Sequence, residues 1–242
     1  MSLPHFFAGA PPLGEPVALA SEDARHAVRS LRLREGDEFT SSDGRGGLVR
    51  CRVVRAARLL VEGQVLERTE EPRPRPGLSV LLSPPKGDRL TWAVQKLTEL
   101  GVDRIVLVES ARGVRRWEGD RAARIGPRLE AVAREAAKQA RHRFLPEVVG
   151  PIPWAEAVVP DVEPTVILWE RARRGLLASL PEDRPDRLAL VVGPEGGIPE
   201  EDAVAAERAG AVLAGLGPAI LRIETAAVAA AAVVLARYGR LG

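Results

Sequence analysis

The sequence predicts an α/β protein in which a small β-barrel precedes a parallel sheet covered by helices. Three observations predict this fold. Apolar segments are short and strand-like up to about residue 70, and beyond it strands alternate with helices. A stiff, proline-spaced segment, Glu70–Gly77, separates the two regions. Two glycine-rich loops each follow an apolar strand and lead into a helix, as they do in parallel sheets.

The region before the proline-spaced segment shows short strands and one helix. The helix begins at Ser21, a favoured N-cap residue, and carries Glu22 and Asp23 in its first turn. A glycine-rich turn, Asp43–Gly47, is typical of a hairpin. The expected strands are Val17–Ala20, Asp37–Ser41, Leu48–Val54 and Leu59–Leu66. We therefore expect a small barrel over residues 1–71, a linker over 72–77 and a second domain over 78–242.

The second region alternates strands and helices. Leu78–Leu82 is an apolar run typical of a buried parallel strand, and the amphipathic helix after it ends at Gly101. A long charged helix then reaches about Ala140. Further strands are expected at Ile105–Val108, Val166–Trp169, Leu188–Val192 and Ala211–Ala214. This alternation predicts a parallel sheet with helices on both faces.

Composition excludes several classes of protein. Hydrophobic residues make up 45% of the chain and charged residues 28%, which is an ordinary globular balance. The single Cys51 excludes an internal disulfide, and the three histidines lack ligand spacing, so we expect no metal. The longest apolar run, Ala226–Ala236, is too short to span a bilayer. The proline-broken, partly acidic start does not fit a signal peptide, so we expect a cytoplasmic protein.

The two glycine-rich loops, Gly193–Ile198 and Leu216–Thr225, predict a ligand pocket. They follow strands, and ligands of open α/β sheets bind beyond the carboxyl ends of the strands. The helix after the first loop opens with the acids Glu200, Glu201 and Asp202, which disfavour a phosphate at this place. A nucleoside that carries a sulfonium cation and no phosphate meets no such objection. The alternative, that both loops are tight turns without a ligand, stays open.

Basic residues concentrate in two segments. The net charge is only +2, yet ten basic residues accompany four acids between Ala111 and Arg143. Nine arginines accompany four acids between Arg25 and Arg58. Such concentration on a nearly neutral background indicates contacts with nucleic-acid phosphates. The alternative is a solvated helix face.

These loops resemble the motifs of a known family. Gly193–Ile198 and Leu216–Ala226 resemble the cofactor motifs of SPOUT-class methyltransferases. Lys86–Arg89, followed by Gln95–Val102, resembles one branch of that class, the 16S rRNA uridine-N3 methyltransferases. The combination is highly specific, whereas any one motif alone is weak.

The resemblance covers essentially the whole chain, including the paired aromatic residues near the start and the segment His26–Arg32. It departs from the family pattern at two places. The family's usual arginine before the paired aromatics is His5 here. In a later segment the family's glycine–arginine pair is shifted, which leaves open whether Arg141, His142 or Arg143 takes the place of the family arginine.

The resemblance implies a trefoil knot in the domain over 78–242, a rare exception to the rule against threaded chains. It also implies a PUA-like RNA-binding barrel over 1–71, S-adenosyl-L-methionine as cofactor, and 16S rRNA of the small ribosomal subunit as substrate. A homodimer with cofactor sites near its interface is implied too. Alanines between Ala226 and Ala232 would permit close helix approach, or they pack on their own sheet. The alternatives are methylation of another RNA, such as the ribose 2′-O of tRNA, and a non-catalytic RNA-binding or assembly protein.

The resemblance also assigns site residues. Arg222 is the first candidate for a cation that stabilises the uracil anion while N3 attacks the sulfonium methyl. Glu224 could position Arg222 or the cofactor amine, or cap its helix, and Glu170 is expected at the ribose. The cofactor-binding residues are Leu168, Glu170, Gly193, Glu195, Gly196, Gly197, Ile198, Leu216, Gly217, Ile220, Leu221, Ile223, Thr225 and Ala226. The RNA-binding residues are Arg25, Arg29, Arg32, Lys86, Arg89, Arg115, Arg116, Arg141 and Arg143, and either of the last two could reach the substrate from the other subunit.

Overall fold

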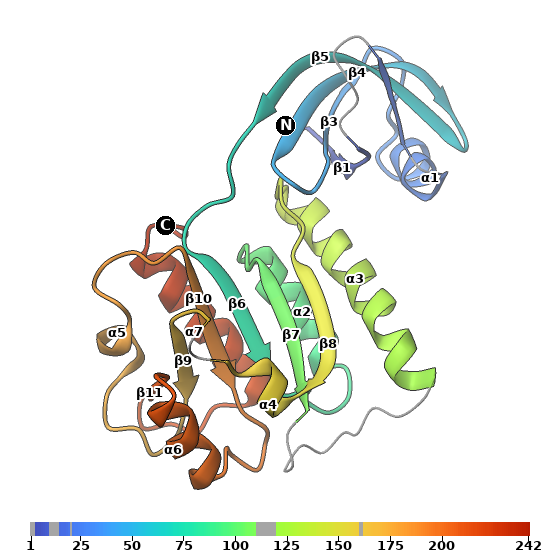
Figure 1. The fold of residues 1–242 in the computed structure, drawn as a ribbon. Coiled ribbons are helices and arrows are strands. Elements are labelled where there is room, and N and C mark those ends of the chain that lie inside the picture. The colour runs from blue at the N-terminus through green and yellow to red at the C-terminus, as the bar shows by residue number, and fades with distance from the viewer. Residues whose placement is uncertain (1–2, 10–14, 20, 110–119, 160–161) are drawn as a thin grey trace. The chain divides into compact units, whose positions relative to one another are not determined.

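A computed structural model describes residues 3–9, 15–19, 21–109, 120–159 and 162–242 of the chain. The chain forms two compact units (Figure 1). The first unit contains Met1–Arg73 together with Ala137–Leu145, and the second contains Pro74–Ala136 and Pro146–Gly242. The segment Ala137–Leu145 thus joins the N-terminal unit from the middle of the chain.

The first unit is built on a five-stranded sheet with the order β1-β3-β4-β5-β2. The hairpin turn predicted between β3 and β4 is confirmed, because these strands pair antiparallel and the Asp43 carboxylate accepts hydrogen bonds from the backbone N–H groups of Arg45 and Gly47. The three-residue strand β1, which the sequence did not indicate, pairs parallel with β3. The elements are β1 (His5–Phe7), β2 (Pro16–Ala18), α1 (Ser21–Arg29), β3 (Glu38–Ser42), β4 (Gly47–Ala57) and β5 (Leu60–Glu70).

The segment Ala137–Leu145 packs on the first unit through backbone hydrogen bonds. The Ser42 hydroxyl donates to the Arg143 carbonyl oxygen at 2.6 Å, and the Leu145 N–H donates to the Gly44 carbonyl oxygen at 3.0 Å. The Phe144 ring lies against Gly46, where a Cβ atom would meet it at 3.0 Å. Gly46 has a φ of +122°, so only glycine suits this turn and leaves room for the ring.

The second unit contains a six-stranded, fully parallel sheet, as expected, with the order β11-β9-β10-β6-β7-β8. Its edge strand β8 was not predicted. The reason is local, because β8 contains Gly150, Pro151 and Pro153, and its residues are only partly buried, so no apolar run marks it. The strands are β6 (Gly77–Leu82), β7 (Arg104–Glu109), β8 (Glu147–Pro153), β9 (Thr165–Leu168), β10 (Arg187–Val192) and β11 (Val212–Ala214).

Helices cover both faces of this sheet (Figure 1). Leu78, Val80 and Leu82 of β6 pack in one cluster with α2 and α7, whereas Leu81 packs on the opposite face in a cluster that includes α6. This alternation follows from the two-residue period of a strand. The helices are α2 (Arg89–Glu99), α3 (Asp120–Ala140), α4 (Trp154–Ala157), α5 (Leu176–Ser179), α6 (Glu200–Arg208) and α7 (Ile223–Arg237).

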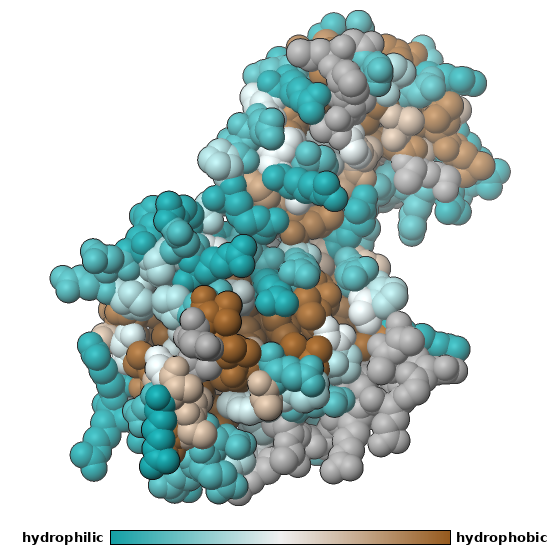
Figure 2. Space-filling view, in the orientation of Figure 1, coloured by the Kyte–Doolittle hydropathy of each residue, from teal (hydrophilic) through white to brown (hydrophobic). Residues whose placement is uncertain are grey.

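The alanines of α7 pack mainly on their own unit. Ala226, Ala227, Ala230 and Ala231 are buried in the cluster that covers the sheet, and Val228 is only partly buried. Small side chains let α7 approach the neighbouring α2 and the strands closely. In Figure 2 the hydrophobic residues of this unit gather where Figure 1 shows its sheet, and hydrophilic residues surround them. Over the described part of the chain, no helix has the length and apolar character needed to cross a membrane.

Candidate functional site

A cavity of about 710 Å³ opens at the carboxyl ends of three neighbouring strands, β11, β9 and β10, with Arg89 at the start of α2 also on its wall. The loops that follow these strands line it, so its place is the one that open α/β sheets offer to ligands. Of the fourteen residues predicted to bind the cofactor, all except Thr225 line this cavity. Thr225 is exposed in the first turn of α7. The sequence missed Trp169, Val192, Pro194, Ala214, Pro218 and Ala219, which also line the cavity.

Trp169 is the most substantial of the missed residues. It directly follows β9, and its indole Nε1 is buried without a hydrogen-bond partner among the described residues. A signal was present in the sequence, because the predicted strand ends on this tryptophan at the edge where the pocket was expected. A partly buried indole at a cavity wall offers an apolar surface to a ligand.

The first glycine loop is shaped by close contacts that exclude side chains. A Cβ atom on Gly193 would lie 2.4 Å from Cγ1 of Ile198. Gly197 has a φ of +74°, and a Cβ atom there would lie 3.0 Å from Oε1 of Glu170. The Gly197 N–H donates to the Pro194 carbonyl oxygen at 2.9 Å, which closes the turn. The loop therefore presents bare backbone beside the Glu170 carboxylate.

The second loop brings apolar side chains and one cation to the cavity. Ile220 is 93% exposed and Leu221 is 37% exposed, although both are large and apolar. Gly217 has a φ of +100° and no heavy atom within 4 Å of its Cβ position, so its backbone faces open space. Arg222 immediately precedes α7 in an extended conformation. The Arg222 side chain is exposed, and it forms no ion pair with any residue that the structure describes.

Glu224 lies behind the cavity wall, in the first turn of α7. Its side chain is 9% exposed, its Oε2 is buried without a hydrogen-bond partner among the described residues, and its Oε1 lies 3.8 Å from Nη1 of Arg89. The same Nη1 of Arg89 lies 3.3 Å from Oε1 of Glu195 in the first glycine loop. Arg89 therefore connects the start of α2, the first loop and the start of α7. Arg222 at the N-cap of α7 makes no side-chain capping hydrogen bond.

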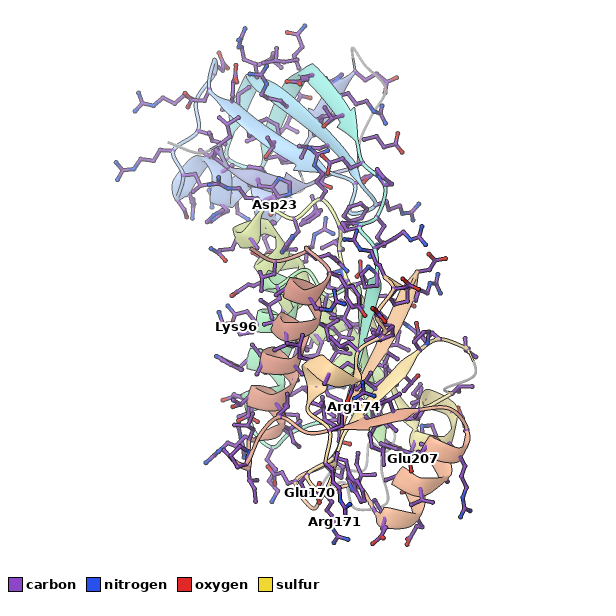
Figure 3. The ribbon with its side chains drawn as sticks, turned by 90° about the vertical axis from the view of Figure 1, so that its left-hand side faces the viewer. Asp23, Lys96, Glu170, Arg171, Arg174 and Glu207 are labelled. Carbon is purple, nitrogen blue, oxygen red and sulfur yellow. The ribbon has the colours of Figure 1, made fainter. Side chains whose placement is uncertain are left out.

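Backbone hydrogen bonds fix the loop after β9 beside the second loop. The Trp169 N–H donates to the Ala214 carbonyl oxygen, and the Gly215 N–H donates to the Arg174 carbonyl oxygen, each at 2.9 Å. Nη1 of Arg171 lies 2.9 Å from Oε2 of Glu200 in the acidic first turn of α6. Figure 3 shows Glu170 and Arg171 at the cavity end of the second unit.

The residues predicted to bind RNA fall in both units. Arg25, Arg29 and Arg32 are exposed in the first unit, whereas Lys86 and Arg89 belong to the second. Arg115 and Arg116 lie outside the described residues.

The two basic residues after α3 differ in their surroundings. Arg141 is exposed and has a φ of +57°. Arg143 is held within the first unit, since its guanidinium donates to the Thr69 hydroxyl at 3.1 Å and lies 3.1 Å from the Glu71 carboxylate. Lys138, in the last turn of α3, pairs at 2.7 Å with the buried Asp23 of α1, which Figure 3 labels.

Two family models match the chain. A model described as RNA methyltransferase domain matches residues 71–235, and a model described as RNA methyltransferase PUA domain matches residues 19–66. The ribosomal RNA small subunit methyltransferase E of Mycobacterium tuberculosis is 34% identical over 226 residues, which cover 91% of this chain and 86% of the relative. The protein of the same name from Bacillus subtilis is 30% identical over 220 residues, which cover 86% and 85%.

Solved structures are similar over nearly the full length. The ribosomal RNA small subunit methyltransferase E of Neisseria gonorrhoeae, bound to S-adenosyl methionine, superposes with a TM-score of 0.87 at 28% identity and covers 98% of each chain. A methyltransferase of Legionella pneumophila with the cofactor SAM bound gives a TM-score of 0.85 at 26% identity, again over 98% of each chain.

Proposed function

Because the chain belongs to the RNA methyltransferase family, we propose that it transfers the methyl group of S-adenosylmethionine to N3 of a uridine in the 16S rRNA of the small ribosomal subunit. The observation that carries this proposal is the cavity beyond β11, β9 and β10, which the predicted cofactor loops line. The relatives whose names specify small-subunit ribosomal RNA match over most of their own length, which supports the same substrate here.

The cavity fits a nucleoside ligand without phosphates. Leu216, Ile220 and Leu221 provide apolar surface for an aromatic base, and the Glu170 carboxylate is available to accept hydrogen bonds from ribose hydroxyls. The bare backbone at Gly197 and Gly217 lets a ligand approach closely. When bound, S-adenosylmethionine supplies an electrophilic methyl group on a positively charged sulfur.

Arg222 is the residue that we propose stabilises the reacting base. The N3 proton of uracil must leave for N3 to become a nucleophile, and a cation beside the ring favours the resulting anion. Arg222 lines the cavity and no described acid neutralises it, so its guanidinium is available for this role.

Glu224 has a positioning role in this proposal. It is buried, and the cation beside it is Arg89. A buried carboxylate with one oxygen lacking a partner fixes the neighbouring guanidinium, which in turn contacts Glu195 of the first glycine loop. Glu224 thus supports the wall of the cavity from behind.

We propose that residues 1–71 form a PUA-like RNA-binding barrel, that 72–77 form a linker, and that 78–242 form a knotted methyltransferase domain. The order of the strands supports a knot, because β11 lies at an edge of the sheet whereas the next helix, α7, packs on β6 and β10 in its middle. Residues 215–222 must therefore pass the ends of β9 and β10. We also propose that the protein is a cytoplasmic homodimer. Ile220, which is exposed beside the cavity, is suited to an interface between the two subunits.

The proposal is tested by incubating the protein with S-adenosylmethionine labelled in its methyl group and small subunits that lack the mark. We expect label in 16S rRNA at a single uridine N3, and none when the subunits already carry the mark. Label on a ribose or on tRNA would replace this function with that of a related RNA methyltransferase. Absence of S-adenosylmethionine binding in calorimetry would support a non-catalytic RNA-binding protein instead.

A further inference from the structure

A second, more open cavity of about 400 Å³ adjoins the first. Lys86, Gly87, Asp88, Arg89 and Trp92 line it, all of them from the end of the loop after β6 and the start of α2. Arg89 lines both cavities, so they share a wall. A ligand in the second cavity would therefore lie next to the cavity that we propose for the cofactor.

Trp92 is a large exposed side chain that does not contribute to the packing of α2 on the sheet. Its exposed fraction is 43%, and it is the only aromatic residue among the large exposed apolar side chains of the described residues. The neighbouring α2 residues Leu90, Ala93 and Val94 are buried against the sheet, so α2 is held without Trp92. An indole that faces solvent beside a cavity is a surface on which a nucleic-acid base can stack.

Two cations, Lys86 and Arg89, line the same cavity as this indole. Lys86 and Arg89 have side chains that are 53% and 34% exposed, and both face Glu195, at 3.7 Å and 3.3 Å. Asp88 is the one acid that lines the cavity. The half-exposed ammonium of Lys86 can meet a phosphate while the exposed ring of Trp92 meets a base, and a nucleotide carries both groups.

We propose that this second cavity binds a nucleotide of the RNA substrate next to the methylated uridine, with its base stacked on Trp92 and its phosphate facing Lys86. The inference rests on the proposed function, since it is the shared wall with the cofactor cavity that makes the occupant a neighbour of the target base. Stacking on Trp92 would hold the single strand in place while the target base enters the first cavity. Recognition by stacking also tolerates different bases.

The test compares Trp92→Ala and Trp92→Phe with wild type in methyl transfer to small subunits. Stacking contributes about 1–3 kcal/mol per base, so Trp92→Ala should raise KM for the subunits at least about fivefold. KM for S-adenosylmethionine should stay unchanged, and Trp92→Phe should restore most of the loss because it keeps an aromatic ring. Leu177→Ala is the matched control, since Leu177 is 60% exposed on α5 and lines neither cavity.

Two further measurements separate stacking from charge. Lys86→Gln should make RNA binding less dependent on salt concentration, whereas Trp92→Ala should weaken binding without changing that dependence. The fluorescence lost in Trp92→Phe relative to wild type is the emission of Trp92, and a uridine-containing single-stranded oligonucleotide should quench it. These binding measurements need no turnover, so they report on Trp92 even if the proposed methyl transfer is not observed.

Two results would overturn the inference. The first is a Trp92→Ala variant whose KM for the subunits equals that of the Leu177→Ala control. The second is a change of sedimentation coefficient in Trp92→Ala without RNA, which would show that a second copy of the chain covers this indole.

Discussion

The Nε2 atom of His5 donates a hydrogen bond of 3.1 Å to the backbone carbonyl oxygen of His142. A carbonyl can only accept, so Nε2 carries a proton, and Nδ1 lies 2.9 Å from the hydroxyl oxygen of Thr40. This hydrogen bond joins His5 to the segment Arg141–Arg143, the two places at which the sequence departs from the family pattern. The same bond connects the segment after α3 to β1 of the first unit.

We expect His5 to make the stability of the protein sensitive to acid. Burial lowers the pKa of His5 from 6.5 to about 4, and the nearby charges of Arg141, His142 and Arg143 act in the same direction, against the raising effect of the His142 hydrogen bond. The unfolded chain binds the proton first, so the free energy of unfolding should fall by roughly 3 kcal/mol as the pH drops from about 6.5 to about 4.

Urea denaturation at pH 7 and pH 4 measures this effect. His5→Gln should flatten the dependence, whereas His26→Gln, which changes an exposed histidine of α1, should keep the wild-type slope. All three proteins contain the same carboxylates, so the difference between their pH dependences of unfolding isolates the contribution of His5. Equal slopes for wild type and His5→Gln would refute the assignment.

Arg222→Ala should abolish methyl transfer while S-adenosylmethionine still binds. Removing one group that stabilises developing negative charge costs on the order of 10²–10³ in rate, and the apolar surface and glycine backbone of the cavity remain. Single-turnover rates and calorimetry measure the two effects separately. Arg171→Ala is the control, because this exposed arginine at the same end of the unit pairs with Glu200. Unimpaired turnover would remove Arg222 from the mechanism.

Gly197→Ala should weaken binding of S-adenosylmethionine. An alanine at φ +74° is strained by about 1–2 kcal/mol, and its Cβ atom would lie 3.0 Å from the Glu170 carboxylate in the cavity. Gly210→Ala is the matched control, since Gly210 has a φ of +102° but no heavy atom within 4 Å of the Cβ position and does not line the cavity. Both variants should lose similar thermal stability, and only Gly197→Ala should lose affinity in calorimetry. Equal affinities would show that the first loop does not contact the cofactor.

Arg240→Ala should destabilise the second unit. The Arg240 guanidinium donates to the Asp103 carboxylate and to the Pro76 carbonyl oxygen, each at 2.6 Å, and to the Gly101 carbonyl oxygen at 2.7 Å. Its side chain is 9% exposed and that of Asp103 is 11% exposed, so truncation leaves a buried carboxylate without its cation. Breaking such a pair costs about 3–5 kcal/mol, which thermal unfolding detects. Arg208→Ala, at the exposed end of α6, should unfold like wild type.

Local patterns predicted most of the elements and the main pocket. The apolar runs at β6, β7 and β10, and the glycines at 193–197 and 217, act through the backbone of their own segments, so their effects can be recognised from the sequence. Strands β1 and β8 could not be recognised in this way. β1 is a three-residue strand and β8 is interrupted by prolines, and both exist because a neighbouring strand supplies hydrogen bonds.

The sequence by itself determined the α/β class, the two glycine loops and the family, because each depends on residues close together in the chain. Only the tertiary structure decided which distant residues meet. It placed residues 137–145 on the N-terminal unit, paired Arg89 with Glu195 and Glu224, and made Arg89 a wall shared by the main cavity and the cavity that Trp92 lines. These contacts join residues of different segments, and the packing of helices on the parallel sheet sets their distances, which no local pattern records.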